Sequence, residues 1–184
     1  MNFVATPLAG VFLIEPEPIR DERGFFARTF CAEDFACHGL RSQFVQCSIS
    51  FNARAGTLRG MHWQAPPHAE AKLIRCTQGA IYDVALDLRP ASPTFKHWYA
   101  TELTAENRRM LYVPEGCAHG FQTLVDDSEV LYQISAAYEP SAKRGAHWND
   151  PEYGIQWPLP RKPILSVQDM SYTYSSQAPA STQG

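Results

Sequence analysis

The chain has 184 residues, about the length of one domain and enough to bury a core. Apolar residues make up 45% and charged residues 19%, which is typical of a globular protein. The formal net charge of −3 at pH 7 excludes the basic surface by which proteins attract nucleic acid, so any affinity for anions must come from a local cluster of cations.

Neither the first residues nor the cysteines indicate secretion or membrane insertion. Residues 1–24 contain a short apolar run with no basic segment before it, and acidic residues follow at once. No stretch approaches the ~20 apolar residues of a membrane-spanning helix. The cysteine count is odd and no pair has Cys-x-x-Cys spacing, which predicts reduced thiols in a cytoplasmic protein. The cysteines are Cys31, Cys37, Cys47, Cys76 and Cys117.

In chain order, the first clear element is a short helix over residues 32–39, which Gly39 is placed to end. Strand-like runs then recur at short intervals, separated by turn segments rich in Gly, Pro and Asn. Strands at this spacing, without long helices between them, predict an all-β sandwich or jelly-roll barrel. The runs are residues 44–50, 72–76, 80–88, 97–103, 109–113 and 129–138.

The chain shows no internal repeat and no linker, so we predict a single domain over residues 1–170. Fourteen prolines, several of them directly after strand-like runs, fit a β fold with rigid loops. Residues 171–184 are small and polar, and we expect them to form a loosely ordered tail.

One segment, residues 58–75, combines histidine, cations and aromatic residues. His62 lies between Met61 and Trp63, with Arg59 and Lys72 nearby in sequence. The residues alone leave open a metal site, an anion-binding pocket, an acid–base site or no function. A histidine between apolar neighbours also fits a hydrogen-bonded core residue. Short motifs often match by chance, so the motif alone does not decide between these interpretations.

The metal hypothesis rests on two histidine motifs. "GTLRGMH" and "PEGCAHGF" resemble the two signature motifs of the cupin superfamily of β-barrels. The His-x-His pair of metal-binding cupins is broken here, because Gln64 replaces the second histidine. Glu70 is the remaining candidate to complete a triad with His62 and His119. Lys72 and Arg59 would repel a divalent cation, so we expect no metal.

The acid–base hypothesis gives His62 the role of a base, since imidazole titrates near neutral pH. Removing a proton from a carbon next to a carbonyl requires a partner for the enolate oxygen. Lys72 or Arg59 is placed to be that partner, while the other pairs with a phosphate. Tyr132 and Tyr138 are candidate donors, and one unbroken strand would place them on the same face. A carboxylate behind the imidazole would fix its tautomer.

The spacing of Arg59 and His62 raises a geometric difficulty. The two residues are three apart, so a regular strand would point their side chains to opposite faces of the sheet. Gly60 lies between them, and we expect it to permit a bulge that brings both side chains to one cavity.

Seven motifs occur in order over roughly residues 10–170: "DERGFF", "LRGMHWQ", "KLIRC-x-x-G", "DVALDLRPASPTF", "PEGCAHGF", "WNDPEYGIQWP" and "ILSVQD". Together they resemble the dTDP-4-dehydrorhamnose 3,5-epimerase family. The resemblance implies a cupin-like jelly-roll (double-stranded β-helix) barrel with short peripheral helices, without metal or other cofactor. It also implies a homodimer with exchanged N-terminal strands, and conversion of dTDP-4-dehydro-6-deoxy-D-glucose to dTDP-4-dehydro-L-rhamnose.

The resemblance also implies roles for individual residues. His62 would be the base, Asp169 its partner, Lys72 the group beside the enolate oxygen and Tyr132 the proton donor. The remaining matches are to residues that bind the nucleotide sugar, with Arg23 and Phe26 reaching the neighbouring subunit's nucleotide. The matched binding residues are Arg59, His119, Tyr138, Gln46, Arg23 and Phe26.

Three positions depart from the family pattern. Arg28 stands where a glutamate is common, Lys143 where an acidic residue is usual, and Ser48 where an asparagine is common. If Arg28 reaches the base of the nucleotide, a cationic hydrogen-bond donor has replaced a carboxylate acceptor at that contact. Because thymine presents an N3–H donor and cytosine an N3 acceptor, CDP becomes the alternative to dTDP as the carrier.

Three other functions remain open at this level. The first is a C3-only or C5-only epimerase of a specialised deoxysugar pathway. The second is a sugar-nucleotide-binding cupin without catalysis, which would need neither His62 nor Asp169. The third is a metal-dependent cupin oxygenase. The presence of both His62 and Asp169 favours the epimerase.

Overall fold

The computed structural model describes residues 1–159 and 163–177, and strands dominate it. Five of the six predicted strand runs match observed strands to within two residues at each end. The last run was predicted too long, since its strand ends at Ile134 rather than at residue 138. The strands are β1 (Asn2–Ala5), β2 (Phe12–Glu15), β3 (Ile19–Asp21), β4 (Gly24–Phe26), β5 (Gln46–Asn52), β6 (Leu58–Gln64), β7 (Lys72–Gln78), β8 (Ala80–Asp87), β9 (Trp98–Thr104), β10 (Met110–Val113), β11 (Cys117–Thr123), β12 (Ser128–Ile134) and β13 (Lys143–Gly145).

The helical segments are short and lie in the connections between strands and after the last strand. The predicted helix is present as α1 (Ala32–Cys37) and is followed by Gly39, which has a positive φ of 69°. The other helical segments are a 3₁₀ turn η1 (Pro140–Ala142), the helix α2 (Val167–Ser171) and a 3₁₀ turn η2 (Ser175–Gln177). No helix in residues 1–159 and 163–177 has the length and apolar character needed to cross a membrane.

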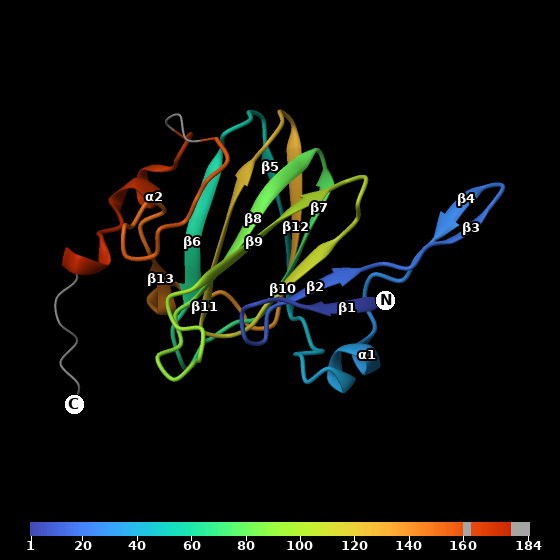
Figure 1. Cartoon of the computed structure of the whole chain (residues 1–184), viewed down its shortest axis with the longest axis horizontal. Coiled ribbons are helices and arrows are strands. Elements are labelled where there is room, and N and C mark those ends of the chain that lie inside the picture. The colour runs from blue at the N-terminus through green and yellow to red at the C-terminus, as the bar shows by residue number, and fades with distance from the viewer. Residues whose placement is uncertain (160–162, 178–184) are drawn as a thin grey trace.

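The strands form two facing antiparallel sheets (Figure 1). One sheet has six strands in the order β1-β2-β10-β7-β12-β5, and the other has five in the order β13-β6-β11-β8-β9. The chain crosses between the sheets repeatedly, as in a jelly roll. The hairpin of β3 and β4 extends away from both sheets (Figure 1). This architecture confirms the predicted all-β fold with short peripheral helices.

The space between the sheets is filled by side chains from the inner faces of both. On β7, Ile74 and Cys76 alternate inward and meet Phe121 of β11 and Ala85 of β8. These side chains are 2% exposed or less, so each contributes on the order of 1–3 kcal/mol by leaving water. The same inward alternation brings Lys72, at the start of β7, toward one end of this interior, where apolar filling gives way to polar side chains.

Two further clusters cover the outer faces of the sheets. Helix α1 places Phe35 on the six-stranded sheet, against Ile14 and Met110. The segment after β13 covers the five-stranded sheet, where Trp157 packs with Met61 among other side chains. This segment leads the chain to α2, which lies beside β6 (Figure 1).

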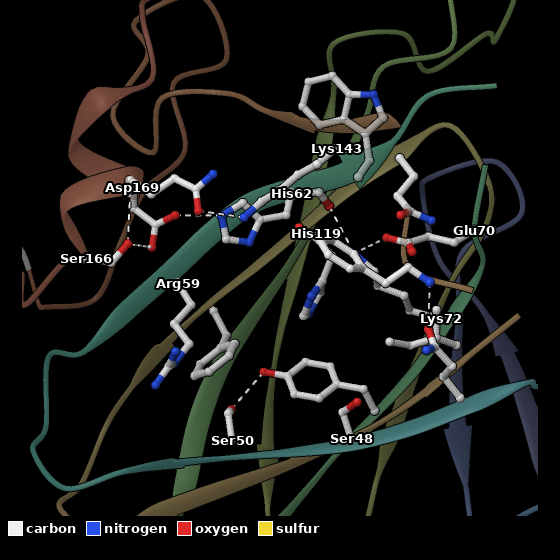
Figure 2. Close-up of a pocket in the computed structure, with 18 residues that line it drawn as sticks. Ser48, Ser50, Arg59, His62, Glu70, Lys72, His119, Lys143, Ser166 and Asp169 are labelled. Atoms are coloured by element: carbon white, nitrogen blue, oxygen red, sulfur yellow. Dashed lines mark hydrogen bonds and ion pairs between the residues drawn. The ribbon is translucent and has the colours of Figure 1, made fainter. Parts of the chain in front are cut away.

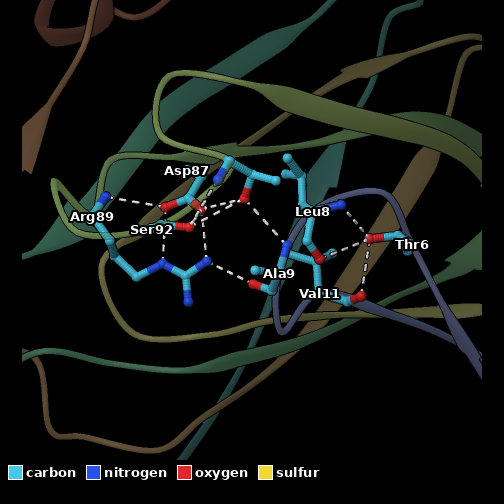
Figure 3. A network of polar contacts seen from close by, with 8 residues as sticks. Thr6, Leu8, Ala9, Val11, Asp87, Arg89 and Ser92 are labelled. Carbon is cyan, nitrogen blue, oxygen red and sulfur yellow. Dashed lines mark hydrogen bonds and ion pairs between the residues drawn. The ribbon is translucent and has the colours of Figure 1, made fainter.

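A polar network around Asp87 ties the connection after β8 to the N-terminal loop (Figure 3). The buried Asp87 carboxylate accepts hydrogen bonds from Nε and Nη2 of Arg89 at 2.8 and 2.7 Å. It also accepts from the hydroxyls of Ser92 and Thr94 at 2.5 and 2.7 Å. Arg89 donates further to the carbonyl of Ala9 at 2.6 Å. One carboxylate therefore organises two loops that are distant in sequence.

The predicted tail of residues 171–184 is described as far as Gln177. Its first part makes defined contacts, since the backbone N–H of Ser175 donates to Oδ2 of Asp150 at 2.6 Å. Residues 178–184, which belong to the same predicted tail, lie outside the described residues.

Candidate active site

A cavity of about 500 Å³ opens between the two sheets and is lined mainly by polar side chains (Figure 2). Its walls come from β5, β7 and β12 of one sheet, β6 and β11 of the other, and from β13 and α2. The cavity brings together all four predicted catalytic residues and six of the predicted binding residues. They are His62, Asp169, Tyr132, Lys72, Arg59, His119, Tyr138, Gln46, Ser48 and Lys143.

His62 and Asp169 form a close pair at one wall (Figure 2). Nε2 of His62 lies 2.6 Å from Oδ1 of Asp169, and the side chains are 30% and 5% exposed. Burial alone would raise the pKa of Asp169. The hydrogen bond and charge of His62, the hydroxyl of Ser166 and the charge of Lys143 outweigh this effect, so the pKa lies below its usual value. An ionised carboxylate only accepts, so in the neutral imidazole Nε2 carries the proton and Nδ1 has the free lone pair.

Helix α2 carries Asp169 and fixes the position of its carboxylate through the residue at its N-terminus. Ser166 is its N-cap, and the Ser166 hydroxyl accepts from the backbone N–H of Asp169 at 3.0 Å and donates to Oδ2 at 2.9 Å. Neither this helix nor the role of Ser166 was predicted from the sequence. The spacing Ser166-x-x-Asp169 is a capping pattern, and that pattern was the signal available.

The predicted bulge in β6 is confirmed. In the pairing of β6 with β11, His119 lies opposite His62 and Phe121 opposite Arg59. Two residues of β6, at positions 60 and 61, therefore oppose the single Gly120 of β11. Gly60 takes a φ of 123°, and a Cβ there would lie 2.5 Å from Cα of Gly120. Glycine therefore provides both the backbone conformation and the close approach of the strands, and Arg59 and His62 both reach the cavity.

Lys72 carries a nearly buried positive charge at the cavity wall. Its Nζ donates to the carbonyl of His62 at 3.2 Å and pairs with Oε1 of Glu70 at 2.9 Å. Glu70 was considered as a metal ligand, but its carboxylate orients this lysine instead. Within residues 1–159 and 163–177, no group of three or more His, Cys, Asp or Glu side chains is arranged to hold a metal ion.

Tyr132 enters the cavity from the sheet opposite to His62. Its hydroxyl lies 3.0 Å from that of Ser50, a residue that the sequence analysis did not single out (Figure 2). Ser50 shares its face of β5 with Ser48 and Gln46 at the strand period of two, which was the available signal. Burial raises the pKa of Tyr132 strongly, and this outweighs the opposing effects of Ser50 and Arg59. The phenol is therefore neutral and can donate a proton.

The second tyrosine reaches the cavity by a different route from the one predicted. Because β12 ends at Ile134, Tyr138 does not share a strand with Tyr132. The side chain of Gln46 instead accepts from the backbone N–H of Tyr138 at 2.8 Å and fixes the loop beside the cavity. Tyr138 is 56% exposed and lies at the cavity's open side.

A second histidine–aspartate pair lies deeper in the cavity. Nε2 of His119 is 2.8 Å from Oδ1 of Asp83, and both side chains are buried. Burial raises the pKa of Asp83, against the opposing effects of His119 and Lys72. The buried carboxylate of Asp83 on β8 is thus partnered by a cavity residue.

Three predicted binding residues are not in the cavity of this chain. Arg23 and Phe26 belong to the projecting hairpin of β3 and β4, where Phe26 is 68% exposed and Arg23 pairs with Asp21 (Figure 1). Arg28 follows this hairpin and is also exposed. The predicted contacts of Arg23 and Phe26 are with the nucleotide of a second subunit, and that of Arg28 is with the nucleotide base. The single chain leaves all three as predictions.

Comparison with known proteins assigns the chain to a family. The model of the family described as dTDP-4-dehydrorhamnose 3,5-epimerase matches residues 5–176. The chain belongs to this family. It is 45% identical over 169 residues to the dTDP-4-dehydrorhamnose 3,5-epimerase of Pseudomonas aeruginosa, covering 90% of this chain and 92% of that protein.

Two solved structures extend the similarity to three dimensions. The dTDP-4-dehydrorhamnose 3,5-epimerase of Elizabethkingia anophelis superposes with a TM-score of 0.92 at 38% identity, covering 96% of this epimerase and 97% of that chain. The enzyme of Bacillus anthracis, solved with TDP and PPi bound, gives 0.90 at 43% identity, covering 94% and 98%. The chain described here is accordingly an isomerase with the cupin-like fold and dTDP-4-dehydrorhamnose 3,5-epimerase activity of its family.

Proposed function

We propose that this epimerase inverts C3 and C5 of dTDP-4-dehydro-6-deoxy-D-glucose with His62 as the base and Tyr132 as the acid. The observation that carries the proposal is the placement of an Asp169-backed imidazole and a neutral phenol on facing sheets of one cavity. A sugar ring between them would present one face to each group.

The first step is removal of a proton from carbon. The C4 ketone of the substrate acidifies the hydrogens on C3 and C5, and Nδ1 of His62 has the free lone pair to accept one. Asp169, only 2.6 Å from Nε2, stabilises the imidazolium that forms. The enolate charge develops on the C4 oxygen, where the ammonium of Lys72 supplies the opposing charge. A positioned base of this kind contributes about 10²–10⁴-fold to the rate.

The second step is return of a proton to the opposite face of the carbon. The raised pKa of Tyr132 keeps its phenol protonated until the enolate forms, and Ser50 lies within hydrogen-bond distance of the hydroxyl. After this cycle His62 passes its proton to water and Tyr132 regains one from water. Repeating both steps at the second carbon then inverts both centres. A single cycle would make a C3-only or C5-only epimerase.

The nucleotide diphosphate would occupy the cationic and open side of the cavity. Arg59 is held by Asn52, which accepts from its Nε at 2.8 Å, leaving the other guanidinium nitrogens to bind phosphate. The remaining cavity residues proposed to bind substrate are His119, Gln46, Ser48, Tyr138 and Lys143. We propose dTDP as the carrier, with CDP as the alternative that the departures at Arg28, Ser48 and Lys143 suggest.

We further propose that two copies associate with exchanged N-terminal strands, so that Arg23 and Phe26 of one copy reach the nucleotide of the other. In support, β5 is an edge strand whose Ile49 and Phe51 are 63% and 53% exposed, and Phe26 is 68% exposed. Apolar exposure of this extent commonly marks an interface. Light scattering of the wild type and Phe26→Ser tests this, and a monomeric wild type rejects it.

We propose a cytoplasmic location because the cysteines are unpaired. All five are free thiols, including the exposed Cys37 and Cys47. Exposed unpaired thiols are typical of reducing compartments. Measuring the thiols of protein isolated under alkylating conditions tests the proposal, and a disulfide in most of the molecules would contradict it.

The mechanism is tested by proton NMR of the keto sugar in D₂O. We expect deuterium at both C3 and C5 with the wild type, whereas exchange at one carbon would assign a mono-epimerase. His62→Ala should abolish exchange and leave substrate affinity within a few-fold. Asp169→Asn should cost less than His62→Ala, because it perturbs the base without removing it. Turnover by His62→Ala would remove His62 from the mechanism.

The carrier is tested separately by calorimetric titration with dTDP and CDP. Tighter binding of dTDP, with full turnover of the dTDP sugar, supports the first choice. Tighter binding of CDP, together with turnover of the CDP-linked sugar only, would support the alternative.

A further inference from the structure

On the β13 side of its strand, His62 lies opposite a residue without a side chain. In the pairing of β13 with β6, Gly145 is the partner of His62. A Cβ at this glycine would lie 2.0–2.3 Å from three atoms of the Tyr172 ring, which no real structure tolerates. The φ of Gly145 is not in the left-handed region, so conformational freedom does not explain the glycine. The space that it leaves is occupied by the aromatic ring of Tyr172.

Tyr172 uses this space to contact the catalytic imidazole. The rings of Tyr172 and His62 have centroids 5.8 Å apart and an interplanar angle of 63°, an edge-to-face arrangement. Tyr172 is the C-cap of α2, whose third residue is Asp169. One short helix and its cap thus deliver two contacts to the same imidazole, a carboxylate at Nε2 and an aromatic ring packed against the imidazole.

The hydroxyl of Tyr172 does not account for the residue's position. It is buried and has no hydrogen-bond partner among residues 1–159 and 163–177. Burial raises the pKa of Tyr172, and the charge of Asp169 raises it further, so the phenol remains neutral. Neither a hydrogen bond nor a charge holds the side chain there, which leaves ring packing as its contribution.

We propose that Tyr172 is a positioning residue for His62, and that Gly145 is required because its missing side chain seats the Tyr172 ring. The inference rests on the proposed role of His62 as the base. With the ring in place, the imidazole cannot rotate away from Asp169, and Nδ1 stays directed at the substrate carbon. A displacement of about 1 Å in a reacting group can cost on the order of 10²-fold in rate.

The test is a double-mutant cycle on kcat and KM. Tyr172→Ala should lower kcat about 10- to 100-fold with KM within twofold, because the base is misplaced while the substrate contacts remain. Gly145→Ala should have a similar effect, since its methyl group expels the ring. The double variant should be no worse than Tyr172→Ala, because the two changes remove the same contact. Tyr172→Phe keeps the ring and should restore kcat to within about twofold of the wild type.

Two controls separate positioning from general damage. Tyr174→Ala removes an aromatic contact with His147, at 4.3 Å between centroids, from the same segment and should leave kcat unchanged. If Tyr172→Ala does not fold, Tyr172→Leu replaces it. The Nε2–H proton resonance of His62 in ¹⁵N-histidine-labelled protein should shift in Tyr172→Leu and not in Tyr174→Ala.

Several results would overturn the inference. One is a Tyr172→Ala or Tyr172→Leu variant with an unchanged kcat, or with a raised KM as its only change. Another is a Tyr172→Phe variant whose kcat is as low as that of Tyr172→Ala. The last is a double variant in which the kcat losses of Gly145→Ala and Tyr172→Ala multiply. Failure of the proposed function is distinguishable, because it would appear as turnover by His62→Ala. An inactive His62→Ala with a fully active Tyr172→Ala rejects only the positioning role.

Discussion

Replacing Asp87 by asparagine should destabilise the fold through the loops that it organises. The substitution keeps the shape of the side chain but removes the charge that Arg89 pairs with through two hydrogen bonds at 2.8 and 2.7 Å. Breaking one partner of a buried pair costs about 3–5 kcal/mol. Because the Arg89 side chain is 30% exposed and can reach water, we expect the lower end, about 3 kcal/mol.

A loss of this size corresponds to a lower Tm by about 6–12 °C in a protein of this length. Calorimetry or thermal circular dichroism measures it. The matched control is Glu152→Gln, which breaks the exposed ion pair with Lys96 and should change stability by about 0–1 kcal/mol. An Asp87→Asn variant whose Tm lies as close to wild type as that of the control would refute the reasoning.

The effect should also depend on pH in a defined direction. Burial raises the pKa of Asp87, but hydrogen bonds from Arg89, Ser92 and Thr94 outweigh it and leave the pKa well below its usual range. In the unfolded chain the pKa is about 3.9. The stabilisation is therefore complete above about pH 4 and is lost as the pH falls toward the folded-state pKa. The difference in Tm between wild type and Asp87→Asn should shrink from about pH 4 downward, and a difference that grew in acid would contradict this.

Three further substitutions probe the cavity. Tyr132→Phe should still exchange substrate hydrogens with D₂O but block net inversion, and unchanged epimerisation by NMR would reject its role as donor. Lys72→Met should lower kcat by about 10²–10³-fold, because the enolate loses its opposing charge, and a steady-state assay that finds less than a threefold loss argues against this role. Gly60→Ala should cost at least about 2 kcal/mol in urea unfolding, because its Cβ would lie 2.5 Å from Cα of Gly120 at a φ that disfavours alanine; a wild-type midpoint would show that the strands can separate.

The parts of the fold that could be predicted from the sequence are the strands with β-branched and aromatic character. The runs at residues 72–76 and 80–88 became β7 and β8, which supply Ile74, Cys76 and Ala85 to the core. Strands β6 and β11, which carry His62 and His119, were not among the predicted runs. Their glycines lower the strand propensity. These glycines are present for the close approach of Gly60 and Gly120, which is a tertiary contact that local sequence does not report.

Site residues could be predicted where their type and the order of the motifs pointed to the same role. They could not be predicted where their position depends on contacts between segments that are distant in sequence. The bulge at Gly60 could be predicted because Arg59 and His62 were both assigned to one cavity, although a regular strand would point them to opposite faces. The structure contains this bulge. The extent of β12 did not follow, because the apolar pattern continued past Ile134 while the chain turned at Gln46's hydrogen bond to Tyr138. Tyr172 acts through a contact between distant segments, for which the sequence carried no pattern. Ser50, by contrast, could have been found from its period-two spacing with Gln46 and Ser48 on one strand.

The location of Asp169 separates the requirements for folding from those for turnover. Every strand of both sheets lies before residue 146, whereas the carboxylate that completes the base comes from α2, at residues 167–171. A proteolytic cut just before Ser166 would leave both hydrogen-bonded sheets covalently intact while releasing the one acidic group that His62 needs. Loss of the segment from Ser166 onward could thus silence the enzyme without unfolding its barrel, so its presence in a cell extract would not by itself report its activity.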